Sequence, residues 1–147
     1  MENNERIMEM KEKDIVSKLM GTYEIPTVTV ALDRLGIPLK LKGLTSKEIG
    51  KIRKECTYQV KLKNKIEDRT DSSEFDAGLV ATATTNFDWN AKELLAHHKS
   101  SDAKQLIRKM LLAGEIAVIT DKIMEISGYS DELEEIEDVK NSSNGVE

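Results

Sequence analysis

The sequence predicts a mostly helical α+β protein with five or six helices, a small N-terminal β-hairpin and a disordered acidic C-terminal tail. Aromatic residues make up 4% of the 147 residues and only 2 prolines occur, which disfavours a large sheet. Alternating β-branched residues are confined to one short stretch, whereas apolar residues elsewhere recur every three or four positions. A chain of this length is typical of one domain and can bury a core without disulfides.

The N-terminal region has the pattern of a short, weakly amphipathic helix. Met8, Ile15 and Leu19 are spaced among many charged residues over residues 5–20. Gly21 is expected to end this helix. We therefore assign residues 1–24 to an N-terminal helix or arm that precedes the main domain.

The next stretch predicts a β-hairpin. In residues 27–32, Val28 and Val30 alternate with threonines, and residues 37–41 alternate again after a turn at residues 33–36. Pro38 cannot donate a backbone hydrogen bond, so the second strand is expected to lie at an edge or to start at the proline.

A capping box opens the following helix, because the Thr45 hydroxyl is followed three residues later by Glu48. The spacing of apolar residues extends this predicted helix to about Leu62, with residues 66–70 as a polar connector. Its apolar face is formed by Ile49, Ile52, Cys56 and Val60. Cys56 is expected to be an inert buried thiol, and the lysines opposite it form either a solvated face or a binding surface.

Three further helix starts are predicted from residue pairs that resemble N-terminal caps. A break or kink is expected at Gly114, and Gly128 is expected as the C′ residue of the last helix. This last segment carries an apolar seam at helical spacing. The pairs are Asp71 with Glu74, Asn90 with Glu93, and Asp102 with Gln105; the seam is Leu112, Ile116, Ile119, Ile123 and Ile126.

Charge is unevenly distributed, although the formal net charge is only −5. Residues 39–69 are strongly basic, whereas residues 131–147 contain seven acidic residues and the single Lys140. We expect residues 25–130 to form a single helical domain with the hairpin at its start, and residues 131–147 to be an acidic flexible tail. This asymmetry is typical of self-association, masking of the basic face, or partners of opposite charge.

No pattern of residues predicts catalysis, so we expect neither enzyme activity nor a cofactor or metal site. His97 and His98 are neighbours that would point about 100° apart on a helix, and no cysteine cluster accompanies them. Most helix-start carboxylates have a structural role at the positive end of the helix dipole. The N-terminus lacks a signal peptide and no membrane span is predicted, so the expected location is the cytoplasm.

The candidates for partner contact are large apolar side chains. The loop after the middle helix contains two aromatic residues, and the last helix contains the isoleucine seam; both are explained either by the domain's own core or by an interface. The candidate residues are Phe87, Trp89, Ile116, Ile119 and Ile123. The basic segment 40–69 raises the alternative of nucleic-acid binding, but it contains only Tyr58 for base stacking and no recognition motif, which makes nucleic acid an unfavoured partner.

The order of these features resembles the tail assembly chaperones of tailed phages and defective prophages of Gram-positive bacteria, the PBSX-type or XkdN-like family. The resemblance covers roughly residues 25–130. It includes the hairpin, the capped helix from Thr45, the aromatic loop, and the stretch from Met110 to Ile116 that leads to Ile126-Ser-Gly-Tyr129.

The resemblance implies a non-enzymatic role in tail morphogenesis. Such proteins bind the long tape measure protein, keep it soluble while tail tube subunits polymerise around it, and are absent from the finished virion. Tail tube subunits and further copies of the chain are additional candidate partners. The alternative functions are a small structural protein of the virion and a nucleic-acid-binding protein that uses the basic face.

Overall fold

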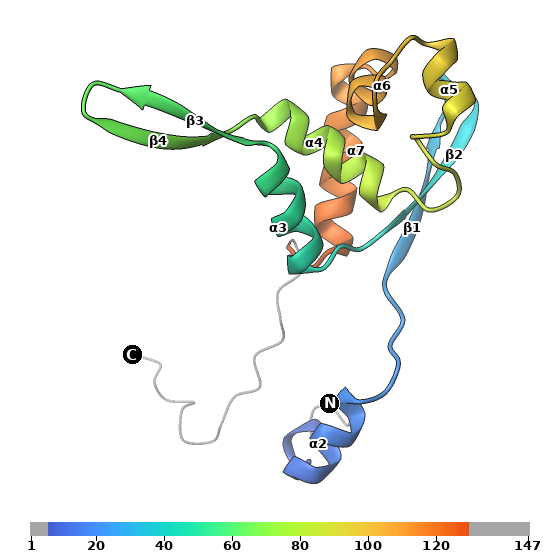
Figure 1. Ribbon diagram of the computed structural model, residues 1–147. Coiled ribbons are helices and arrows are strands. Elements are labelled where there is room, and N and C mark those ends of the chain that lie inside the picture. Colours follow the sequence, from blue (N-terminus) through green and yellow to red (C-terminus); the bar gives the residue numbers. More distant parts are fainter. Residues whose placement is uncertain (1–5, 130–147) are drawn as a thin grey trace, which may run out of the picture. The chain divides into compact units, whose positions relative to one another are not determined.

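The computed structural model describes residues 6–129 of the chain (Figure 1). Residues Ile25–Asp131 form one compact unit, and residues up to Glu24 belong to another. The two units are described separately below. The predicted disordered tail, residues 131–147, lies outside the described residues.

In the N-terminal unit, a helical turn at residues 6–8 precedes helix α2, Glu12–Leu19. The helix predicted over residues 5–20 is therefore interrupted at residues 9–11 and is shorter than expected. It ends before Gly21, as predicted, and the Gly21 N–H donates to the Lys18 carbonyl at 3.0 Å. None of the residues of α2 is buried.

Strands β1, Thr27–Leu32, and β2, Ile37–Lys42, form the predicted antiparallel hairpin. Gly36 in the turn has a φ of +69°, a conformation that favours glycine. The sheet has only two strands, so Pro38 lies in an edge strand, as expected. Leu39 and Leu41 point into the core from β2 and are completely buried.

Helix α3, Ser46–Glu55, begins with the predicted capping box between Thr45 and Glu48. The predicted extension of this helix to Leu62 and the polar connector after it are wrong. Residues Thr57–Leu62 form strand β3, and Lys65–Thr70 form its antiparallel partner β4. Aromatic and β-branched residues after Cys56 favour a strand over a helix, and the two residues between the strands form a tight turn.

Four helices complete the unit: α4, Ser72–Ala83; α5, Lys92–His97; α6, Ala103–Met110; and α7, Ala113–Ile126. Asp71 caps α4 and Asp102 caps α6, as predicted. The predicted cap of α5 by Asn90 is wrong, because the Asn90 side-chain carbonyl accepts instead from the Ala103 N–H at 3.0 Å. The chain breaks between α6 and α7, next to Gly114, as expected.

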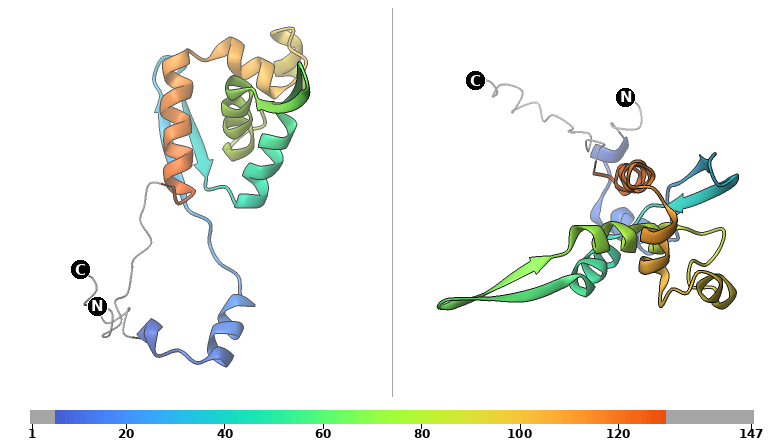
Figure 2. Two further views of the ribbon diagram at one scale, coloured as in Figure 1. Left: turned by 90° about the vertical axis from the view of Figure 1, so that its left-hand side faces the viewer. Right: turned by 90° about the horizontal axis from the view of Figure 1, so that it is seen from above.

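The core lies where α4 packs against α6, α7 and α3, while α7 also contacts the β1–β2 hairpin (Figure 2). Its largest fully buried side chains are Leu39, Leu41, Leu79, Val80, Leu106, Ile107, Ile119 and Ile123. Cys56 is buried at the end of α3, as expected, and burial raises the pKa of its thiol. Helix α7 ends at Ile126, and Gly128 after it has a φ of +97°, as expected of the predicted C′ glycine.

Candidate partner-binding surfaces

Trp89, one of the predicted contact residues, is a core residue in this structure. Only 2% of it is exposed, and its indole Nε1 donates to the Thr84 Oγ1 at 3.0 Å. That hydroxyl in turn donates to the Val80 carbonyl at 2.7 Å. The neighbouring Phe87 ring is 4.8 Å from the Trp89 ring and is only partly buried. The polar atom of the tryptophan is thus satisfied inside the protein, as a buried indole requires.

The isoleucine seam of α7 divides into buried and accessible parts. Ile119 and Ile123 face the core and are 1% and 0% exposed, whereas Ile116 is only partly buried. Toward the N-terminal end of α7, Leu112 and Val118 are 56% and 60% exposed. The five predicted contact residues therefore do not form one surface, and only Phe87 and Ile116 present part of their side chains to solvent. Their contact with a partner stays a prediction.

A small hollow between α4 and the α6–α7 junction contains Ile116. Its other lining residues include Asp76 of α4 and Leu111. Burial, and secondarily the nearby Asp121 carboxylate, raise the pKa of Asp76. The hollow therefore combines an apolar wall with a carboxyl group, an arrangement suited to holding a side chain of a partner rather than to acid–base chemistry.

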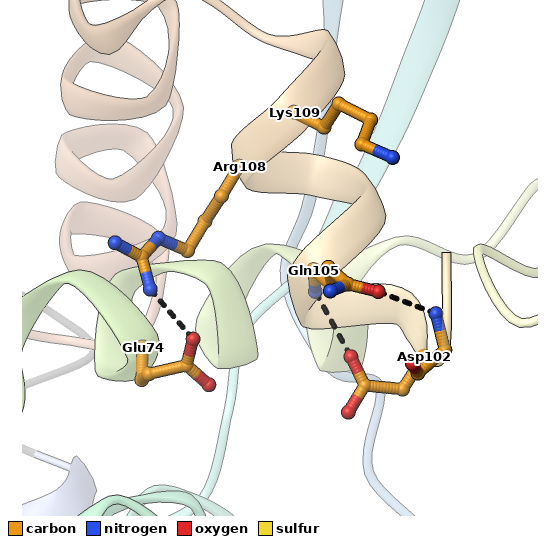
Figure 3. A pocket seen from close by; sticks show the side chains of 6 residues that line it. Glu74, Asp102, Gln105, Arg108 and Lys109 are labelled. Atoms are coloured by element: carbon orange, nitrogen blue, oxygen red, sulfur yellow. Dashed lines mark hydrogen bonds and ion pairs between the residues drawn. The ribbon is translucent and has the colours of Figure 1, made fainter. Parts of the chain in front are cut away.

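A second hollow lies beside α6 and is shown in Figure 3. The Arg108 guanidinium pairs with the Glu74 carboxylate at 2.7 Å, and the Asp102 carboxylate accepts from the Gln105 N–H at 2.9 Å. The Lys109 ammonium donates to the His98 carbonyl at 2.6 Å. Arg108 and Lys109 thus link α6 to α4 and to the end of α5, and Asp102 caps α6 itself.

An ion pair links the β1–β2 turn to the start of α7. The Arg34 guanidinium donates to both Glu115 carboxylate oxygens, at 2.7 and 2.9 Å, and also to the Met110 carbonyl. The same carboxylate accepts from the Leu112 N–H at 2.8 Å. These hydrogen bonds lower the pKa of Glu115 to about 2, and the bond from Arg34 has the largest effect. Glu115 therefore has a structural role in this fold.

Within residues 6–129, no group of three or more His, Cys, Asp or Glu side chains is arranged to hold a metal ion. The His97 and His98 rings meet edge to face at 4.9 Å between centroids. None of the helices in the described part of the chain is both long and apolar enough to cross a bilayer.

The exposed large apolar side chains of the described residues include three groups, besides others such as Ile25 and Tyr129. Helix α2 exposes one set, the α7 start exposes Leu112 and Val118, and the β3–β4 hairpin exposes Tyr58 and Ile66. The set on and after α2 is Ile15, Val16, Leu19 and Met20. The β3–β4 surface was not predicted from the sequence, although two six-residue runs separated by two residues are a recognised hairpin signal.

The chain has relatives among known proteins. The family model described as "Phage XkdN-like tail assembly chaperone protein, TAC" matches residues 16–140. The phage-like element PBSX protein XkdN of Bacillus subtilis (strain 168) is 31% identical over 120 residues, which cover 78% of this chain and 80% of that protein. The uncharacterized protein YqbN of the same strain matches equally, at 31% over 120 residues with the same coverage. The crystal structure of YqbN superposes with a TM-score of 0.54 at 25% identity, covering 74% of this chain and 90% of that chain.

Proposed function

The chain belongs to the XkdN-like family of phage tail assembly chaperones, and from this membership we propose that it binds the tape measure protein of its phage or prophage and keeps it soluble while the tail assembles. The family match over residues 16–140 is the observation that carries this proposal. We further propose that the complex forms in the cytoplasm of the host cell and that the chain is absent from the mature virion.

The physical basis is the protection of an apolar stripe. A long amphipathic helix has nowhere to bury its apolar side until the tail tube surrounds it, and a small protein with an apolar groove can cover that side reversibly. Partly exposed Ile116, next to exposed Leu112, offers such a contact beside the hollow at the α6–α7 junction. Complementary charge would accelerate the encounter without adding much affinity.

The first experiment is co-expression of the full chain with the tape measure protein of the same phage or prophage. The soluble fraction is then separated by size-exclusion chromatography with light scattering. A tape measure protein that becomes soluble and elutes with the chain supports the proposal, and the mass gives the number of copies bound. A tape measure protein that precipitates while the folded chain elutes alone refutes it.

Substitutions then test the predicted contact residues. Ile116→Ala and Phe87→Ala are expected to weaken binding by about tenfold each if these side chains contact the partner, because truncation of a central interface residue costs more than 1 kcal/mol. Ile25→Ala is the matched control, since Ile25 is an exposed apolar residue outside the helices. Equal binding by all three variants, each with unchanged thermal unfolding, would exclude contact at Ile116 and Phe87.

Purified particles give an independent test of the location. Mass spectrometry of virions is expected to find tail proteins without this chain. Stoichiometric amounts of the chain in the particles would instead identify it as a structural component.

A further inference from the structure

The β3–β4 hairpin extends away from the helices of its unit (Figure 1; the same projection is visible from above in Figure 2). Six residue pairs join the strands, from Thr57↔Thr70 at the base to Leu62↔Lys65 at the tip. The base is fixed because the Asp71 N–H donates to the Cys56 carbonyl at 2.9 Å and the Thr57 hydroxyl donates to the Arg53 carbonyl at 2.7 Å. Beyond this base, the strands pack mainly against each other.

The two faces of the hairpin differ in chemistry. Residues that are directly opposite in the register share a face, so Tyr58, Val60 and Leu62 form an apolar row along β3. The β4 residues beside that row are Arg69, Glu67 and Lys65 in the same order. The other face carries one large apolar side chain, Ile66, which is exposed. In the row, Tyr58 is exposed while Val60 and Leu62 are partly buried, and charged side chains border all three.

The hairpin is also basic, with four cationic and two anionic side chains. Arg69 pairs with Glu67 at 3.2 Å, but none of the three lysines takes part in an ion pair with another described residue. The cationic residues are Lys61, Lys63, Lys65 and Arg69, and the anionic residues are Glu67 and Asp68. A ligand for this surface would therefore combine acidic and apolar side chains.

A two-stranded hairpin without a covering layer is marginally stable in water, and its outer edges leave backbone groups unpaired. Tight pairing of six residues on each strand, with an apolar row that is only partly covered, is typical of an element that gains its remaining burial from a partner.

The chain itself contains a segment of matching chemistry. Residues 131–138 include six acidic residues together with Leu133 and Ile136, and Val139 continues this spacing of three. If this segment forms a helix on binding, the three apolar side chains fall on one side and acidic side chains flank them. This composition is complementary to an apolar row that Lys65 and Arg69 border, on a hairpin with an excess of positive charge.

Geometry favours a second copy as the source of that segment. Helix α7 ends beside the start of α3, where the Leu44 N–H donates to the Ser127 hydroxyl at 2.9 Å. The hairpin begins after the opposite end of α3, whose ten residues span roughly 15 Å, and its tip lies farther still. A helix over residues 131–138 would span only roughly 12 Å, which is less than the length of α3 alone and does not reach the hairpin beyond it.

We propose that the β3–β4 hairpin binds the acidic segment 131–139 of a second copy of this chain, so that its basic residues and apolar row form a self-association surface. This proposal is independent of the tape measure protein. It allows neighbouring copies to be linked in succession, because each copy offers one hairpin and one acidic segment.

The test uses sedimentation velocity of the full-length chain at low and high salt. Self-association that weakens as salt is raised is expected. The hairpin variant Lys65→Glu/Arg69→Glu, which changes the two cationic residues beside the apolar row, and the segment variant Glu134→Lys/Glu137→Lys should each weaken it on the order of tenfold, because attractive pairs become repulsive. Unchanged thermal unfolding of both variants would show that neither effect is a loss of fold.

The matched control is Lys13→Glu/Lys92→Glu, which changes the net charge as the hairpin variant does but at exposed sites outside the hairpin. It should leave self-association at the wild-type level. An equal mixture of the hairpin and segment variants should form mixed dimers, since each contributes the native half that the other lacks. The combined variant, with both reversals, should regain association.

Three results would overturn the proposal. The first is a chain that stays monomeric at all protein and salt concentrations. The acidic segment would then bind the hairpin of its own copy or would not bind a hairpin at all. The second is association that both variants leave unchanged. The third is a control that weakens association as much as the hairpin variant does, which would reduce the effect to net charge.

Discussion

Replacement of Gly43 by alanine tests how closely the β2–α3 junction packs on the end of α7. A Cβ atom at Gly43 would lie 2.5 Å from the Ile126 carbonyl oxygen, about 0.9 Å closer than the 3.4 Å at which ordinary contact begins. The obstacle is backbone, so it cannot rotate away as a side chain can. The same junction is held by the Gly43 N–H, which donates to the Pro26 carbonyl at 2.8 Å, and by the Leu44–Ser127 hydrogen bond.

The magnitude follows from these two features. Overpacking of a tight contact costs about 1–3 kcal/mol, and the loss of one hydrogen bond at the separated junction adds about 1 kcal/mol. We therefore expect Gly43→Ala to lower the free energy of unfolding by about 3 kcal/mol, and the melting temperature by roughly 10 °C.

Gly50→Ala is the matched control. Gly50 is exposed within α3, and a Cβ there would meet no atom within 4 Å. Alanine has the better helix propensity, so this variant should gain about 0.5–1 kcal/mol. Urea unfolding followed by far-UV circular dichroism measures both variants. A Gly43→Ala protein as stable as wild type would refute the close approach, and equal destabilisation by both substitutions would refute the argument from contact.

Three further predictions concern the core and the ion pair at the start of α7. The pKa of Glu115 in the folded protein is about 2, below its ordinary 4.5. Its carboxylate therefore contributes stability above pH 4.5, and this contribution is lost as the pH falls toward 2. In acid unfolding, the difference in stability between wild type and Glu115→Gln should shrink over this pH range. Trp89→Phe removes the hydrogen bond to Thr84 and should cost about 1 kcal/mol in urea unfolding, whereas an unchanged midpoint would show that the bond contributes nothing. Ile123→Ala should lower the free energy of unfolding by about 2–5 kcal/mol, because it opens a cavity in the core. Val118→Ala, on the exposed side of α7, should change it by under about 0.5 kcal/mol. Similar losses in both variants would contradict the assigned orientation of the helix.

The sequence predicted well those features of the structure that depend on residues close together in the chain. The caps at Thr45, Asp71 and Asp102 each satisfy backbone N–H groups within three residues, so the residue types alone indicate them. The same holds for Gly128, since the C′ position requires a positive φ that glycine adopts without strain.

The error at β3 shows how a local pattern can mislead. Ile52, Cys56 and Val60 are four residues apart, which suits one face of a helix, yet only the first two lie on or next to α3. Beyond Cys56, strand propensity and the two-residue turn outweigh that spacing. The predicted cap at Asn90 was wrong for a similar reason. Its side-chain carbonyl accepts from the Ala103 N–H, thirteen residues away, instead of capping α5.

The sequence by itself determined the helix starts, the first hairpin, the uneven charge and the family, all of which are set by residue type and short-range spacing. Only the tertiary structure decided that Trp89 is buried while Ile116 is partly accessible, since the same apolar side chain suits a core or an interface. It also decided the Arg34–Glu115 pair and the approach of Gly43 to Ile126, which join residues about eighty positions apart. Such contacts follow from the packing of whole helices and strands, and no short-range pattern encodes them.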